Sequence, residues 1–294
     1  MNNKVCLLGA TGFIGSAISE KLNQNNIDWI GLSRKNSTDP RIVEVDFTNP
    51  RSIIEIIDAY PNVINAMGSN KPRDFEENPE FVLNSFWNDL DNISAILNAS
   101  NVKKLLNISS GGTVYGEYTG RPSKESDPLK PKSWYGRSKV LEELRFEQLA
   151  HKNNFTYICA RVTNPFGNKS FTKHGFIDVL ANSVLNDLDF NTYQADCYYR
   201  DFIHSSDMAN IIIELLNVDY IDTVNVFNVG SGISTNLIEL AEDTKKMYPN
   251  LKLKRNYLAN KYEVIHSEVC IKKTRMISQK IHKLLSIEEY IKGI

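Results

Sequence analysis

The sequence predicts an α/β fold in which a doubly wound parallel sheet is covered by helices on both faces. Over the first half of the chain, apolar runs of strand length alternate with segments of helical periodicity, which is typical of parallel sheets with crossover helices. A glycine-rich turn at 9–15 directly follows the first apolar run. The 294 residues are enough to bury one large core and a smaller appended one.

The elements expected in the first half follow from this periodicity. The expected strands are Lys4–Leu8, Ile27–Ser33, Ile42–Val45, Asn62–Ala66, Lys104–Ser110 and Thr156–Val162. The expected helices between them are Gly12–Asn23, Pro50–Ala59, Phe81–Ala99 and Tyr135–Lys152.

After about residue 163 the pattern changes to shorter elements. The expected helices are Gly175–Asn186, Ser206–Asn217 and Asn236–Met247, and the expected strands are Asp201–His204, Asn225–Val229 and Leu251–Arg255. We interpret this half as the last strands of the main sheet mixed with a smaller region. The two regions are then interleaved in sequence, with no clean linker between them.

Bulk properties exclude several classes of protein. A net charge of −1 gives no electrostatic reason to expect nucleic acid or an anionic membrane as a partner. The first apolar run, Val5–Leu8, is too short for a signal peptide or a membrane span. Cys6 and Cys159 lie in apolar runs, where a reduced thiol behaves as a small hydrophobe. We therefore expect a cytoplasmic protein.

The glycine-rich turn predicts a dinucleotide-binding site in a Rossmann-type fold. Its residues are Gly9, Ala10, Thr11, Gly12, Phe13, Ile14 and Gly15. Glycines allow a tight turn and a close approach of the backbone to a pyrophosphate, and the following helix offers unpaired amides and a favourable dipole. A tight turn without a ligand is the alternative, but the strand before and the helix after favour binding.

The end of the second strand indicates which dinucleotide binds. An NAD site usually has an acidic side chain there, for the ribose 2′-hydroxyl. This chain has Ser33 and Arg34 instead, and a guanidinium suits a 2′-phosphate. The sequence therefore favours NADP(H) over NAD(H), with a solvated basic loop as the alternative.

Tyr135 and Lys139 are the candidate catalytic pair. Four residues apart on a helix, they lie on one face. An ammonium beside a phenol stabilises the phenolate, which allows proton transfer to or from a sugar hydroxyl. Such a pair can also be two exposed helical residues. The segment 109–116, Ser-Ser-Gly-Gly-Thr-Val-Tyr-Gly, ends a strand at the carboxyl edge where such sheets bind ligands and favours the catalytic interpretation.

With the glycines at 9, 12 and 15, these motifs resemble the extended short-chain dehydrogenase/reductase family, in its nucleotide-sugar epimerase/dehydratase group. The segments 161–167 and 200–204 also resemble that family, and the resemblance covers nearly the whole chain. It implies cofactor contacts from the turn 9–15, Tyr135, Lys139 and three further residues, and substrate contacts from two others. The further cofactor contacts are Phe47, Ala66 and Asp46, of which Asp46 would contact the adenine. The substrate contacts are Asn164 and Arg200.

This sequence departs from the family's motif at the position of the hydroxyl that completes the catalytic site. The position that usually carries it is Gly111, so Ser110, or alternatively Thr113, is expected to bond the substrate. The Asp-Glu pair of the family's 4,6-dehydratases is replaced by Gly112-Thr113, which argues against dehydration.

The resemblance implies an NAD(P)-dependent oxidoreductase that acts on a nucleotide-activated hexose. We expect NADPH-dependent reduction of a 4-keto sugar nucleotide, with a UDP-sugar 4-epimerase as the alternative and a non-catalytic dinucleotide sensor as a distant one. Residues 1–163 would form the cofactor domain and 164–294 mainly the substrate-binding region. The resemblance also implies a homodimer and a role in polysaccharide biosynthesis. The histidines form no metal-binding pattern, so no metal site is expected.

Overall fold

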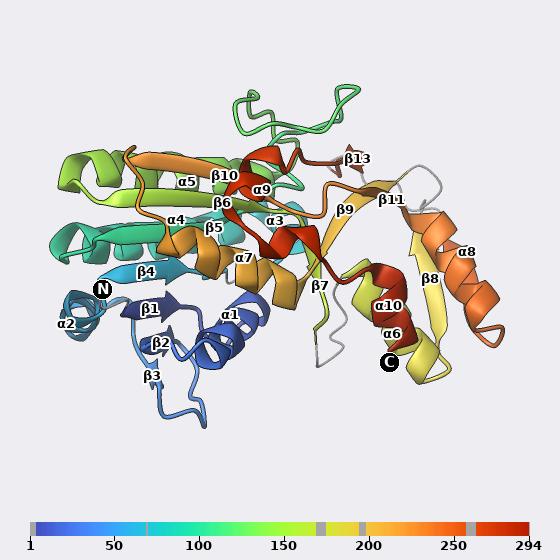
Figure 1. The fold of residues 1–294 in the computed structure, drawn as a ribbon, viewed down its shortest axis with the longest axis horizontal. Coiled ribbons are helices and arrows are strands. Elements are labelled where there is room, and N and C mark those ends of the chain that lie inside the picture. The colour runs from blue at the N-terminus through green and yellow to red at the C-terminus, as the bar shows by residue number, and fades with distance from the viewer. Residues whose placement is uncertain (1–3, 69, 169–174, 194–197, 257–262, 294) are drawn as a thin grey trace. The chain divides into compact units, whose positions relative to one another are not determined.

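A computed structural model describes residues 4–68, 70–168, 175–193, 198–256 and 263–293. Seven strands form the main sheet in the order β10-β6-β5-β4-β1-β2-β3 (Figure 1). Their bounds are β1 Val5–Leu8, β2 Trp29–Ser33, β3 Ile42–Glu44, β4 Asn62–Asn65, β5 Lys104–Ser110, β6 Thr156–Val162 and β10 Val224–Val229. Parallel pairing joins β3, β2, β1, β4 and β5. The predicted fold class is confirmed.

Helices connect these strands and cover both faces of the sheet. They are α1 Phe13–Gln24, α2 Pro50–Ala59, α3 Pro72–Glu77, α4 Pro79–Ala99, α5 Trp134–Asn153 and α7 Ser205–Asn217. Figure 1 shows α1 and α7 on the near face, while α4 and α5 lie behind the sheet. The strand order reverses between β1 and β4, and open α/β sheets bind ligands beyond the carboxyl ends of strands at such a point.

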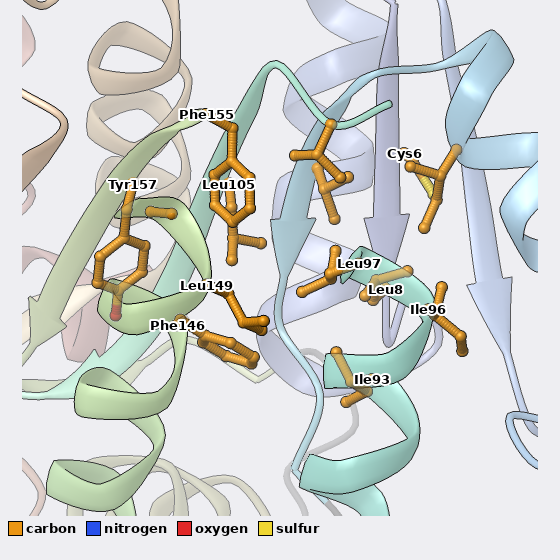
Figure 2. Packing of buried hydrophobic residues seen from close by; sticks show 14 of the residues in the cluster. Cys6, Leu8, Ile93, Ile96, Leu97, Leu105, Phe146, Leu149, Phe155 and Tyr157 are labelled. Atoms are coloured by element: carbon orange, nitrogen blue, oxygen red, sulfur yellow. The ribbon is translucent and has the colours of Figure 1, made fainter. Parts of the chain in front are cut away.

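Alternate residues of the strands build the core on the face covered by α2, α4 and α5. Cys6 and Leu8 of β1 point to this face, where Ile93, Ile96 and Leu97 of α4 meet them (Figure 2). Phe146 and Leu149 of α5 pack beside Leu105, Phe155 and Tyr157 in the same cluster. Each fully buried apolar side chain of this size contributes about 1.5–3 kcal/mol to folding. The burial of Cys6 and Cys159, both free thiols, is as predicted.

The chain divides into two compact units that are interleaved in sequence. Unit 1 comprises 1–110, 133–161 and 209–227, and unit 2 comprises 111–132, 162–208 and 228–294. Unit 1 thus contains nearly all of the main sheet with α1–α5.

Unit 2 is built from short strands and helices. Its elements are β7 Asn164–Phe166, β8 Asp189–Tyr193, β9 Tyr199–His204, β11 Ser234–Asn236, β12 Lys252–Asn256, β13 His266–Ser267, α6 Phe176–Leu185, α8 Leu237–Met247, α9 Lys272–Ile277, η2 Lys280–His282 and α10 Ile287–Lys292. The central strand β9 pairs with β7, β11 and β13, and β12 pairs with β8. Phe166, Tyr198 and Phe202 form one small core, while Leu180 and Phe190 belong to another.

Within the described ranges, none of the helices has the length and apolarity that a membrane crossing requires.

Candidate functional site

The turn after β1 forms a cradle that requires glycine at positions 9 and 15. Gly9 has φ +79°, and a Cβ on it would lie 2.8 Å from the carbonyl oxygen of Ala66. A Cβ on Gly15 would collide with the Gly9 carbonyl, so α1 packs directly against the turn. The N-cap of α1 is Gly12, and no side chain caps the first turn. The helix amides and dipole therefore remain available to an anion, as a dinucleotide pyrophosphate requires.

The end of β2 presents Ser33 and Arg34 in different environments. Ser33 is buried, and its Oγ lies 2.7 Å from Oγ1 of Thr11 in the glycine turn. Arg34 is exposed, and its Nη1 lies 3.3 Å from a carboxylate oxygen of Asp89 on α4. An exposed ion pair contributes only about 0–1 kcal/mol, so the guanidinium can be redirected to another anion at little cost.

The other predicted cofactor residues, Asp46, Phe47 and Ala66, differ in their exposure and in their contacts. The exposed Asp46 accepts hydrogen bonds from the amide and hydroxyl of Thr48, which hold the pKa of its carboxyl below the usual value. Phe47 is buried in the sheet core, so its side chain is occupied with packing. Ala66 follows β4 directly and lies against Gly9. Ala66 thus borders the glycine turn.

Tyr135 and Lys139 lie in the first two turns of α5. Ser133 caps this helix by accepting a hydrogen bond from the Gly136 amide at 3.0 Å. The ring of Tyr135 packs edge-on against Phe75 of α3, with the centroids 5.6 Å apart. Lys139 is buried, and the capped helix holds both residues in unit 1 with the glycine turn.

The ammonium of Lys139 is held by a carboxylate. Its Nζ lies 2.9 Å from Oε1 of Glu142. Burial opposes the charged form, but the attraction of Glu142, Tyr135 and Glu143 outweighs burial, and the pKa of Lys139 is raised. The lysine therefore stays a cation throughout the neutral range, as stabilisation of a phenolate requires.

The three hydroxyls after β5 have separate roles. Ser109 is buried and donates a hydrogen bond to Glu143. Ser110 is half-buried, and its hydroxyl makes no hydrogen bond within the described part of the chain. Oγ1 of Thr113 is buried and has no hydrogen-bond partner among the residues that the structure describes. Ser109 is thus engaged in structure, and Ser110 remains available for a substrate, while the partnerless hydroxyl of Thr113 is buried.

Sequence reasoning missed two buried polar clusters in unit 1. Glu143 of α5 and Arg161 of β6 form a bidentate ion pair, with Nη2 and Oε2 2.8 Å apart. Glu142 accepts a hydrogen bond from Asn107 of β5 at 2.8 Å. A charged residue inside the apolar strand Thr156–Val162 was the available signal for the first cluster. For the cluster of Glu142 and Asn107, the available signal was a carboxylate three residues after Lys139.

Unit 2 contains a cavity of about 290 Å³ that brings Asn164 and Arg200 together. It is lined by Asn164, Pro165, Phe166, Gly175, Phe176, Ile177, Asn191, Tyr198, Arg200, Phe202, Leu237 and Glu263. The guanidinium carbon of Arg200 lies 5.1 Å from the ring centre of Tyr198, and its Nη2 is 2.9 Å from Glu263. Aromatic rings beside a buried arginine suit a planar base attached to phosphate.

Arg200 and Asp201 are both buried, and they bond different partners. Asp201 accepts hydrogen bonds from the amides of Ser231 and Gly232 and from the Ser231 hydroxyl. Burial raises the pKa of Asp201 to about 6, although these hydrogen bonds oppose the shift. Asp201 thus fixes the loop after β10, while Arg200 borders the cavity.

Comparison with known proteins agrees with this geometry. A model of the NAD-dependent epimerase/dehydratase family matches residues 5–230. The dTDP-4-dehydro-6-deoxyglucose reductase of Escherichia coli is 27% identical over 258 residues, covering 82% of this chain and 80% of that protein. A putative UDP-glucose 4-epimerase of Methanocaldococcus jannaschii is 28% identical over 254 residues, covering 82% and 81%.

Solved structures share the fold over the whole chain. The UDP-glucose 4-epimerase of Thermus thermophilus, solved with NAD, superposes with a TM-score of 0.84 at 19% identity, covering 99% of this chain and 100% of that one. The enzyme of the same name from Thermotoga maritima, solved with UDP-glucose, gives 0.82 at 20% identity, covering 99% of each chain.

Proposed function

Because the chain belongs to the NAD-dependent epimerase/dehydratase family, we propose that it is an oxidoreductase of a nucleotide-activated hexose, with Tyr135 and Lys139 as its catalytic pair. The observation that carries this proposal is the buried, ion-paired ammonium of Lys139 on the capped helix of Tyr135. The glycine cradle of the same unit fits a nicotinamide dinucleotide, which would contact the turn after β1. Such a cofactor supplies or accepts a hydride at a sugar carbon when it is bound.

The residues of the chain would manage the proton that accompanies this hydride. When a 4-keto group is reduced, Tyr135 gives its phenolic proton to the sugar oxygen, and Lys139 stabilises the phenolate that remains. When a hydroxyl is oxidised, the phenolate takes the proton back. Ser110 or Thr113 would hydrogen-bond the same sugar oxygen and orient it. The nucleotide end of the substrate would occupy the cavity beside Asn164 and Arg200.

Two reactions share this machinery, and we propose the NADPH-dependent reduction of a 4-keto sugar nucleotide. Arg34 at the end of β2 supports it, since a guanidinium suits a 2′-phosphate. A 4-epimerase with retained NAD is the second candidate. It is supported by Asp89, whose carboxylate already pairs with Arg34 and would repel a 2′-phosphate.

Arg34→Ala should weaken NADPH binding about 10- to 100-fold, because it removes hydrogen bonds from a cation to a phosphate. NADH binding should hardly change. Fluorescence titration of the purified protein with each reduced cofactor measures both affinities. Arg51→Ala, which removes an equally charged and more exposed side chain of unit 1, serves as the control. Equal affinity of Arg34→Ala and wild type for NADPH would exclude readout of the 2′-phosphate by Arg34.

The reaction itself is tested by the cofactor that the protein retains. The freshly purified protein is denatured, and any released dinucleotide is identified. An empty site that prefers NADPH, with turnover of dTDP-4-keto-6-deoxyglucose, supports the reductase. Near-stoichiometric NAD, with interconversion of UDP-glucose and UDP-galactose, supports the epimerase instead.

We also propose a homodimer through α4 and α5, as the family resemblance implies. Phe81 and Trp87 of α4 and Leu144 of α5 leave large apolar surfaces exposed, with 68%, 44% and 56% accessible. Sedimentation at micromolar concentration should give twice the mass of the chain, and Leu144→Lys should give a monomer. A monomeric wild type would contradict the dimer.

The same resemblance favours a role in polysaccharide biosynthesis. The buried free thiols of Cys6 and Cys159 support a reducing, cytoplasmic environment.

A further inference from the structure

A chain of buried side chains leads from the Lys139 ammonium to the carboxyl end of β4. Oε1 of Glu142 lies 2.9 Å from Nζ of Lys139 and accepts a 2.8 Å hydrogen bond from the amide of Asn107. The Oδ1 of Asn107 accepts one from the amide of Asn65 at 2.9 Å, and Oδ1 of Asn65 accepts from the Met67 backbone N–H at 3.3 Å. These residues come from α5, β5 and β4, and none of them is more than 9% exposed as a whole residue.

A contribution to folding stability does not by itself explain this series of hydrogen-bonded side chains. Burying an ammonium and a carboxylate costs several kcal/mol per ion in desolvation, and apolar side chains of similar size often replace such groups without loss of stability. Two buried amides add to that cost unless every donor and acceptor is paired. Here Asn65 donates to Asn107, and Asn107 donates to Glu142. Oε1 of Glu142 therefore accepts two hydrogen bonds, one from Asn107 and one from the Lys139 ammonium. This order of bonds favours the ionised carboxylate.

We propose that Glu142 is a positioning residue for the catalytic pair: through Lys139 it sets the place and the effective charge of the ammonium that acts on Tyr135. Asn107 and Asn65 hold Glu142 in this role, and they connect it to the segment that lies against the glycine cradle. The proposal rests on the function proposed for Tyr135 and Lys139.

The charges around Lys139 single out Glu142. Within the described part of the chain, the titratable groups that act on its ammonium are Glu142, Glu143 and Tyr135, all from α5, while the uncharged Asn107 of β5 bonds Glu142. The charge of Glu143 is matched by the bidentate Arg161 of β6. Glu142 is therefore the carboxylate that balances Lys139. Without it, one of the attractions that oppose the effect of burial is lost, and the lysine would lose its proton at a lower pH.

Glu142→Gln removes this charge while keeping the shape, and Glu147→Gln on the same helix is the matched control. Protein labelled with ¹⁵N-lysine is observed by NMR, and Lys139→Met assigns the Lys139 Nζ signal. A slowly exchanging ammonium signal is expected in wild type and Glu147→Gln. In Glu142→Gln the signal should persist near neutral pH but titrate at least about one pH unit lower than in wild type. An unchanged signal in Glu142→Gln overturns the proposal.

The pH profile of kcat gives a second readout, with dTDP-4-keto-6-deoxyglucose and NADPH or with UDP-glucose and NAD as probes. Tyr135 controls the alkaline limb in reduction and the acidic limb in oxidation. Without the carboxylate, the ammonium favours the phenolate more strongly, so this limb should move about one pH unit lower in Glu142→Gln. A uniform loss of kcat with an unshifted profile indicates a merely structural role and overturns the proposal.

These readouts separate the proposal from the function on which it rests. A Lys139 signal that depends on Glu142, in a wild type without turnover, supports the positioning role and contradicts the proposed function. If Glu142→Gln does not fold, Asn107→Leu removes the bond that holds the carboxylate and takes its place in both measurements. With Asn107→Leu, a wild-type Lys139 signal and profile overturn the proposal.

Discussion

Tyr135→Phe should lower kcat about 10²- to 10⁴-fold, the usual contribution of a general acid or base. The ring can still pack edge-on against Phe75, so α5 and α3 keep their contact and only the hydroxyl is lost. Affinity for the reduced cofactor should therefore stay near that of wild type. The measurement is steady-state turnover, with kcat and KM determined separately at several pH values.

Tyr60→Phe is the control, because it removes the same hydroxyl from a half-buried tyrosine that follows α2. Full activity of Tyr135→Phe would contradict the catalytic assignment. If wild type itself turned over no nucleotide sugar but bound a dinucleotide, the protein would be a sensor on this fold. The expected pattern is a large loss in kcat for Tyr135→Phe and none for Tyr60→Phe.

Periodicity predicted the main sheet well, because its strands are buried on both faces and read as continuous apolar runs. Lys104–Ser110 and Thr156–Val162 form the strands β5 and β6 with the predicted bounds. The strand predicted at Asp201–His204 exists as β9, but it lies in the small sheet of unit 2, whereas β10 joins the main sheet. The residue pattern of a strand does not identify the strand beside it in the sheet, because that pairing joins segments far apart in the sequence.

The elements that the sequence did not predict are short. β7 has three residues and includes Pro165, which weakens a strand signal. β8, Asp189–Tyr193, has only five residues, and the consecutive polar residues Asn191 and Thr192 interrupt any alternation. The six-residue helix α3 is too short for a 3.6-residue period to emerge, yet its Phe75 packs against Tyr135.

The candidate site was predictable where its chemistry is local. The glycine turn needs no distant residue to be recognised, and Tyr135 and Lys139 share one helix. The buried clusters were not predictable in this way. Glu142 and Glu143 are adjacent in sequence, but one turns to Lys139 and Asn107 while the other turns to Arg161. That division depends on how α5 is rotated against β5 and β6, which no local pattern records.

Arg161→Met should lower the free energy of unfolding by about 3–5 kcal/mol, since it leaves the Glu143 carboxylate buried without its partner. Both side chains of the pair are only 7% exposed, so water cannot replace the lost cation. The remaining bond from Ser109 satisfies part of the carboxylate but supplies no charge. Urea unfolding of wild type and variant at neutral pH measures the difference.

The double variant Glu143→Leu/Arg161→Met should recover most of that loss, because two apolar side chains remove the buried charges together. Arg41→Met is the control, as Arg41 forms an exposed pair with Asp39 and its loss should cost less than about 1 kcal/mol. If Arg161→Met were as stable as wild type, the ion pair would not stabilise the contact between α5 and β6, contrary to what its geometry indicates. If the double variant were stable but less active, the ion pair would fix how α5 presents Tyr135 and Lys139, an effect separable from its effect on folding.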